Sequence, residues 1–196
     1  MSEIKDSGNR REFSTGAVRD MAEGKGRCDL LPLDVISDLF VELKCEKYER
    51  VNIILNYLNS ALEIWKGDAS SLDSNRMDFV VDSLYGALKE FLKQSDFADI
   101  PTMVLELSAH FEQGAIKYAE NNWKQGIPVN CYIDSAIRHY LKWLRGDTDE
   151  RHDRAFVWNI VCCIWEVEHH GKRNTDKKEN ACTDNAESRG IELSAR

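Results

Sequence analysis

The chain has 196 residues, enough for one full-sized domain and short for two. Hydrophobic residues make up 42% of it and charged residues 31%, a composition that excludes a disordered polymer and a fibrous repeat. The net charge of −8 makes it a poor passive binder of DNA or of acidic lipid, so we expect no nucleic-acid polymer and no membrane among its partners.

The two ends differ from the body of the chain. Residues 1–13 are polar and residues 171–196 contain almost no large apolar side chains, so we expect a mobile N-terminus and a disordered tail. The N-terminus has no apolar run typical of a signal peptide. The six cysteines form no C-x-x-C pair, which favours free thiols in a reducing compartment. We therefore expect a cytoplasmic protein.

Between these ends, apolar residues recur every three or four positions, which is typical of amphipathic helices. The spacing predicts helices over residues 35–43, 48–65, 77–92, 102–118, 132–144 and 149–169. Thr102 is expected to cap the fourth helix, and Thr148 or Asp149 the sixth, while Gly146 ends the fifth. Since no alternating β pattern is sustained, we predict an all-α fold, a single-domain helical bundle with disordered termini.

Residues 14–32 combine glycines with Arg19, Lys25 and Arg27. A flexible basic loop of this kind can surround phosphates with side chains and backbone N–H groups. It is not a Walker loop, because GxxxxGK[ST] is absent. The alternative is a polar lead-in that docks on the first helix.

Charged residues also gather near the start of the predicted sixth helix. Glu150 and Asp153 are three positions apart, so on a helix their carboxylates share one face and can bind one hard cation such as Mg²⁺. The alternative is a solvated acidic helix start that the helix dipole favours. His152 and Asp153 together resemble the His-Asp doublet of one class of metal phosphohydrolases. In the fifth helix, Arg138 is most simply the partner of an intrahelical ion pair with Asp134.

Three blocks resemble a known family when they are taken together and in order. The blocks are STGAVRDMAEGKGRCDLLP at residues 14–32, HFEQGAIKYAENNW at 110–123, and DSAIRH at 134–139 continuing into DERHDRAFVWN at 149–159. They look like the dATP/dGTP diphosphohydrolase N-terminal domain family of bacteriophages, which is similar to the MazG-like all-α nucleotide pyrophosphohydrolases. The resemblance places the domain at residues 14–170, with a helical insertion over residues 40–100.

The resemblance implies that dGTP or dATP is hydrolysed between the α and β phosphates, giving the monophosphate and pyrophosphate with Mg²⁺ or Mn²⁺. Because such a reaction needs carboxylates for the metal and a base, we expect metal ligands at Glu112, Glu150 and Asp153, with His139 or His152 as a further ligand or as the base. The substrate-binding residues would be Arg19, Lys25, Arg27, Lys117, Tyr118, Asn122, Trp123, Arg138 and Asn159. One departure is that the ExxE motif of MazG-like enzymes is absent from the fourth helix.

Two other functions stay open at this point. A non-enzymatic helical adaptor would bind a partner protein and should expose an apolar patch. A triphosphohydrolase of the His-Asp type would release inorganic triphosphate instead of pyrophosphate. The sequence also leaves open whether the chain forms a homo-oligomer, and a phage-encoded protein would work in the host cytoplasm.

Overall fold

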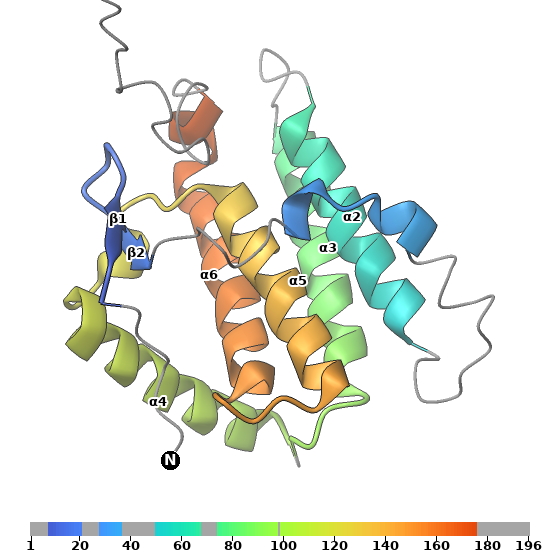
Figure 1. Ribbon diagram of the computed structural model, residues 1–196. Helices are drawn as coiled ribbons and strands as arrows, with labels where there is room; N and C mark the ends of the chain where they lie inside the picture. The colour runs from blue at the N-terminus through green and yellow to red at the C-terminus, as the bar shows by residue number, and fades with distance from the viewer. Residues whose placement is uncertain (1–7, 21–27, 37–49, 68–73, 98, 176–196) are drawn as a thin grey trace, which may run out of the picture.

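The structure is a computed structural model that describes residues 8–20, 28–36, 50–67, 74–97 and 99–175. Helices dominate it (Figure 1), and the prediction of an all-α fold is confirmed. The long helices are α2 (Val51–Lys66), α3 (Ser74–Leu92), α4 (Ile100–Tyr118), α5 (Val129–Arg145) and α6 (His152–Thr175). None of the helices in these ranges has the length and apolar character needed to cross a membrane.

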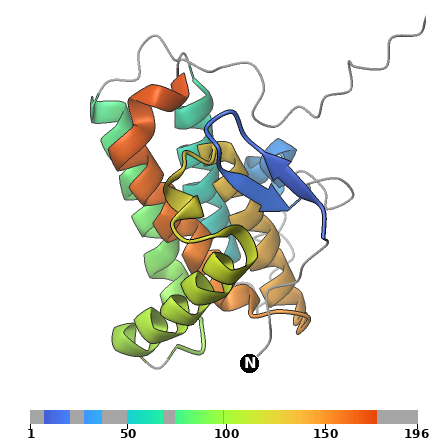
Figure 2. The same cartoon turned by 90° about the vertical axis from the view of Figure 1, so that its left-hand side faces the viewer.

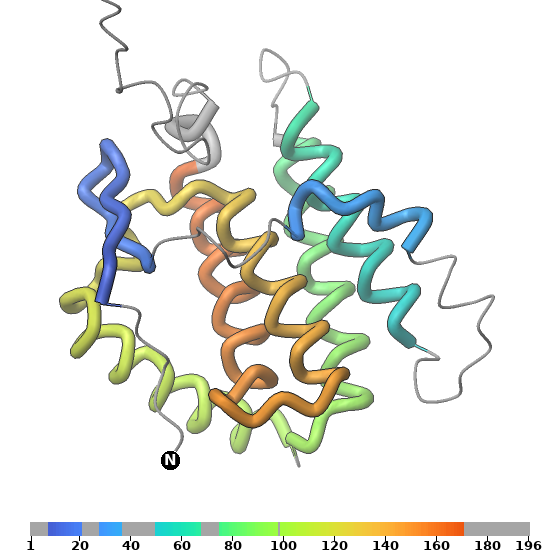
Figure 3. The backbone as a smooth tube through the Cα atoms, in the orientation of Figure 1, coloured from blue at the N-terminus to red at the C-terminus, as the bar shows by residue number. Residues whose placement is uncertain are grey.

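Four of these helices form a closed bundle. Helix α2 packs against α3 and α5, and α6 packs against the same two helices (Figures 1 and 3). The apolar stripe of each helix faces the centre, where Leu55, Leu84, Ile137 and Phe156 are fully buried. Burying a side chain of this size contributes about 1.5–3 kcal/mol. The helices that the sequence assigns to an insertion, α2 and α3, therefore make up half of the bundle.

Helix α4 lies outside the bundle and packs on α6 (Figure 2). Next to its C-terminal end lies a short hairpin in which β1 (Arg10–Glu12) pairs antiparallel with β2 (Val18–Asp20). Gly16 adopts φ of 85° in the turn, a left-handed conformation that glycine tolerates without steric cost. Each strand has only three residues, which is too short for an alternating pattern of apolar and polar side chains to reveal the hairpin in the sequence.

The amide of Asn122 attaches the hairpin to the helices. This residue begins the 3₁₀ helix η4 (Asn122–Lys124), which follows α4. Its Oδ1 accepts a hydrogen bond of 2.7 Å from the N–H of Val18, and its Nδ2 donates one of 2.8 Å to the carbonyl of the same residue. The Asn122 side chain thus forms hydrogen bonds with both the N–H and the C=O group of Val18 in β2.

Several predicted boundaries change in the structure. Asp99 caps α4, because its carboxylate accepts from the N–H of Thr102 at 2.7 Å; the prediction of Thr102 as the cap is wrong. The cap predicted at Thr148 or Asp149 is also wrong, since α6 begins only at His152. The left-handed Gly146 ends α5 as predicted.

The ends of the predicted domain are only partly described. Residues 33–36 are helical, which includes the first two residues of the helix predicted over 35–43, and residues 37–49 lie outside the described part. Residues 1–7 and 176–196 lie outside it too. The expected mobile segment does not extend to residues 10–13, because β1 is paired and Phe13 is buried in the core.

Candidate functional site

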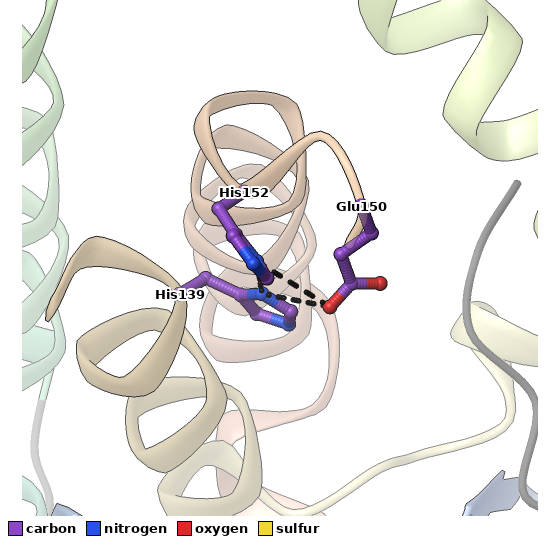
Figure 4. Close-up of side chains that lie close together, drawn as sticks. All are labelled: His139, Glu150 and His152. Atoms are coloured by element: carbon purple, nitrogen blue, oxygen red, sulfur yellow. Dashed lines mark hydrogen bonds and ion pairs between the residues drawn. The ribbon is translucent and has the colours of Figure 1, made fainter. Parts of the chain in front are cut away.

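Two histidines and one carboxylate converge where α5 and α6 pack together (Figure 4). His139 extends from α5, His152 is the first residue of α6, and Glu150 lies in the loop between the two helices. The Nδ1 atoms of the two histidines are 3.1 Å apart. Oε1 of Glu150 is 3.3 Å from Nδ1 of His139 and 3.4 Å from Nδ1 of His152. We call these three residues the His-Glu-His cluster.

The loop at residues 146–151 brings the cluster together. It reverses the chain between α5 and α6, as the tube in Figure 3 shows. His139 and His152 therefore face each other from neighbouring helices (Figure 4). The side chain of His152 is 1% exposed, and those of Glu150 and His139 are 12% and 18% exposed. One edge of an otherwise buried cluster is therefore open to solvent.

Burial disfavours the charged form of His139. Burial lowers the pKa of His139 well below its usual value, and the fields of His152 and Arg138 lower it further. A neutral imidazole has a lone pair on one of its two nitrogens. Because Glu150 forms no ion pair with Lys or Arg among the described residues, its carboxylate and these nitrogens have only one another as close partners. With the lone pair on Nδ1 of both rings, this set of acceptors would be stabilised by a shared cation.

The spacing of the three atoms fits a metal ion. Bonds of about 2.1 Å to nitrogen and oxygen place neighbouring ligand atoms about 3.0–3.4 Å apart in octahedral or tetrahedral geometry. The observed separations are 3.1, 3.3 and 3.4 Å. Imidazole suits first-row transition ions, whereas Mg²⁺ prefers an all-oxygen set. Of the two expected ions, Mn²⁺ therefore fits this cluster better than Mg²⁺.

A second group of possible ligands shares His152 with the cluster and adds Asp147 and Asp149. Its carboxylates already have cationic partners. Asp147 accepts from Nε of Arg145 at 2.7 Å, and Asp149 lies 3.4 Å from Nζ of Lys142. These ion pairs account for the acidic pair without a metal, so the His-Glu-His cluster is the stronger candidate.

The metal ligands expected from sequence do not come together. Asp153 is buried, and its carboxylate accepts two hydrogen bonds from Arg151, at 3.0 and 2.7 Å. Glu112 is exposed on α4 and belongs to neither candidate group. Glu150 precedes α6, so the helical spacing of three residues does not apply to it, and the metal-binding roles of Glu112 and Asp153 stay predictions.

Basic residues from the hairpin and from α4 join these elements to each other and to α6. Arg19 of β2 donates from Nη2 to Oδ1 of Asn159 at 2.9 Å, and its field also lowers the pKa of His139. Lys117 forms a buried ion pair with Asp20 at 3.1 Å. Lys25 and Arg27, expected in the same basic loop, lie outside the described residues.

Three other predicted binding residues have structural partners. Arg138 forms the intrahelical ion pair with Asp134 that the spacing predicts. Trp123 packs edge-on against Phe111 and against Trp165, with ring centroids 5.3 and 5.0 Å apart.

Tyr118, at the end of α4, lies under the guanidinium of Arg10 at 5.1 Å. Burial raises the pKa of its phenol. Like the roles of Trp123 and Arg138, its binding to substrate stays a prediction.

Two residues near the cluster were missed by the sequence analysis as members of the site. Asp149 hydrogen-bonds His152, a pairing that its position three residues earlier could have indicated. His110 of α4 is buried, and its ring packs against Trp158 of α6 with ring centroids 5.5 Å apart. No spacing rule links His110 to the cluster, because the contact depends on how α4 packs on α6.

Comparison with known proteins agrees with the resemblance. The family described as dATP/dGTP diphosphohydrolase, N-terminal, matches residues 90–177, a range that includes α4, α5, α6 and the whole His-Glu-His cluster. Neither the curated proteins nor the solved structures give a match. The match does not extend to the N-terminal block at residues 14–32. Over residues 90–177 this chain is therefore similar to the dATP/dGTP diphosphohydrolase N-terminal family.

Proposed function

We propose that the protein is a metal-dependent hydrolase that cleaves purine deoxynucleoside triphosphates, dGTP or dATP, to the monophosphate and pyrophosphate. The observation that carries the proposal is the His-Glu-His cluster, whose three ligand atoms are 3.1–3.4 Å apart. The family match supplies the substrate class. A MazG-like relationship and a bacteriophage origin stay predictions.

The ligands of the proposed metal, Mn²⁺ or Mg²⁺, are His139, Glu150 and His152. When bound, a divalent ion neutralises the triphosphate and lowers the pKa of a water molecule. Three protein ligands leave coordination positions for that water and for phosphate oxygens. This assignment replaces the carboxylate trio expected from sequence.

Two cations outside the cluster are candidates to supply the remaining charge that a triphosphate requires. They are Arg19 of β2, which hydrogen-bonds Asn159 about two turns into α6, and Lys117 of α4, which pairs with Asp20 of the hairpin. A charge-assisted hydrogen bond to phosphate contributes roughly 1.5–3 kcal/mol. The protein thus needs to position the triphosphate and hold the metal, and the attacking water supplies the nucleophile.

A nucleotide panel tests the proposed substrate class. The protein is incubated with Mn²⁺ and each of dGTP, dATP, dCTP, dTTP, GTP and dGDP, and the products are separated by ion-exchange chromatography. We expect turnover of dGTP and dATP, slower turnover of the pyrimidine nucleotides, and no turnover of dGDP. Equal rates on all triphosphates would contradict the purine deoxynucleotide assignment, and no turnover of any would contradict the enzyme.

A protein-binding role is the second candidate, and one observation favours it. Helix α4 exposes large apolar side chains at Ile100, Val104, Leu105 and Ile116, with exposed fractions of 50% to 81%. Adaptors and homo-oligomers use such surfaces. Analytical sedimentation of the wild type and of Leu105→Glu tests whether a second copy of the chain binds there. A dimeric wild type and a monomeric variant would support this role. A wild type that is monomeric, like the variant, would contradict it.

A further inference from the structure

A short hydrogen bond joins Asp149 to the far side of His152. Nε2 of the imidazole lies 2.7 Å from Oδ1 of the carboxylate. An ionised carboxylate can only accept hydrogen bonds, so Nε2 carries the hydrogen. In a neutral imidazole the other nitrogen, Nδ1, then has the lone pair, and Nδ1 is the atom that faces His139 and Glu150.

The hydrogen bond to Asp149 fixes the orientation of the His152 ring. The side chain of His152 is 1% exposed, and among the described residues its contacts to polar side chains are those with Asp149, His139 and Glu150. Asp149 itself is held from α5, where Nζ of Lys142 lies 3.4 Å from Oδ2. A rotation of the ring would break the 2.7 Å bond and remove Nδ1 from the cluster.

We propose that Asp149 is a positioning residue of the metal centre, which fixes the tautomer and orientation of His152 so that Nδ1 is available to a cation beside His139 and Glu150. The inference rests on the proposed function, since it assumes that the cluster binds a metal. A carboxylate behind a ligand histidine typically increases metal affinity by one to two orders of magnitude. Asp149 would therefore influence catalysis without contacting the substrate.

The competing assignment makes Asp149 a metal ligand together with Asp147 and Nε2 of His152. In that case the ion pairs of Asp147 with Arg145 and of Asp149 with Lys142 would have to be replaced by the metal. The positioning role keeps both ion pairs and uses the nitrogen that faces Glu150. The two assignments predict opposite effects of substitutions at Asp147 and Glu150.

The experiment measures the affinity of the metal-free protein for Mn²⁺ by electron paramagnetic resonance of the free ion. The variants are Asp149→Asn, Asp147→Asn and Glu150→Gln, and thermal melting in EDTA checks that each one folds. We expect Asp149→Asn to weaken Mn²⁺ binding about 10- to 100-fold, and Asp147→Asn to leave it within about twofold. Unchanged affinity in Asp149→Asn overturns the positioning role, and a loss in Asp147→Asn equal to that in Asp149→Asn assigns Asp149 as a ligand.

Two further readouts separate the possible failures. If Glu150→Gln binds Mn²⁺ as the wild type does, the proposed metal centre itself is wrong, whereas loss of binding in Glu150→Gln alone refutes only the role of Asp149. Long-range ¹H–¹⁵N NMR of the metal-free wild type reports the tautomer directly and does not depend on the folding of any variant. We expect the Nε2–H tautomer at His152, and the Nδ1–H tautomer would overturn the inference.

Discussion

Arg19 and Asn159 join the N-terminal hairpin to α6 through a hydrogen bond of 2.9 Å between Nη2 and Oδ1. The guanidinium lies over the rings of Tyr132 and Trp158, at 5.2 and 6.0 Å from their centroids. Its Nη1 atom is buried and has no hydrogen-bond partner among the described residues. Asn159 and the two rings thus hold the cation in place, and one of its donors stays unused by the protein. The hairpin is therefore docked on α6 although it is distant in sequence.

Arg19→Ala should weaken dGTP binding by one to two orders of magnitude, because one charge-assisted contact contributes roughly 1.5–3 kcal/mol. Arg10→Ala is the matched control, since it removes a cation from the same hairpin that lies over Tyr118. Equilibrium binding of dGTP in the presence of Ca²⁺, which slows turnover, compares the two variants. If Arg19→Ala melts at a lower temperature but binds dGTP normally, Arg19 has only a structural role.

Mn²⁺ should raise the melting temperature of the metal-free protein more than Mg²⁺ does at the same concentration. A ligand that binds only the folded state stabilises it, and two of the three cluster ligands are nitrogen atoms. Glu150→Gln should remove the shift, whereas Glu112→Gln should keep it, because Glu112 is exposed and outside the cluster. A shift lost in both variants would restore the carboxylate site expected from sequence.

Asp153→Asn should lower stability without affecting the metal response. Burial opposes ionisation of Asp153, yet the two hydrogen bonds from Arg151 hold the pKa of its carboxyl below the usual value. The substitution removes the charge that these bonds require, at a cost on the order of 1–3 kcal/mol. Urea unfolding measures the loss, and melting with Mn²⁺ measures the metal response. A variant that is as stable as the wild type but no longer responds to Mn²⁺ would identify Asp153 as a ligand.

His110 should make the protein less stable in acid. Burial lowers its pKa to about 3, and the charges of Arg154 and Lys117 act in the same direction. Between pH 6.5 and about pH 3 the unfolded chain then binds a proton that the folded chain does not, so the free energy of unfolding falls as the pH falls. The stabilisation is fully present above pH 6.5.

Urea unfolding from pH 7.5 to pH 4 tests this pH dependence. His110→Gln should reduce the slope of stability against pH, because the variant has no group at this position that is protonated only on unfolding. His169→Gln removes an exposed histidine from α6 and should keep the slope of the wild type. If the free energy of unfolding varies with pH in the same way for His110→Gln and the wild type, His110 is not the source of the pH dependence.

The helices were predictable because their apolar residues repeat with helical spacing. The helix predicted over residues 77–92 starts three residues later than α3 and ends at the same residue. The helix predicted over residues 48–65 starts three residues before α2 and ends one residue before it. The hairpin was not predictable from alternation, since what holds it is the side chain of Asn122, more than a hundred positions away from Val18. Local pattern specifies elements, and such distant contacts specify where they dock.

The candidate site was predicted in part. The residues of the His-Glu-His cluster were all named from sequence, His139 and His152 as ligand or base and Glu150 as a metal ligand. The helical spacing of Glu150 and Asp153 does not apply in the structure, because it requires both residues to lie on one helix and α6 begins between them at His152. A helix start moved by a few residues thus changes which side chains share a face.

The most direct test of the proposed function is product analysis of dGTP hydrolysis with and without Mn²⁺. Metal-free wild-type protein, the same protein with Mn²⁺, and Glu150→Gln with Mn²⁺ are each incubated with dGTP, and the phosphorus-containing products are resolved by ³¹P NMR. We predict equal amounts of dGMP and pyrophosphate from the wild type with Mn²⁺, and none from the other two samples. Deoxyguanosine with inorganic triphosphate as the products, or equal activity in Glu150→Gln, would contradict the proposed reaction at the His-Glu-His cluster.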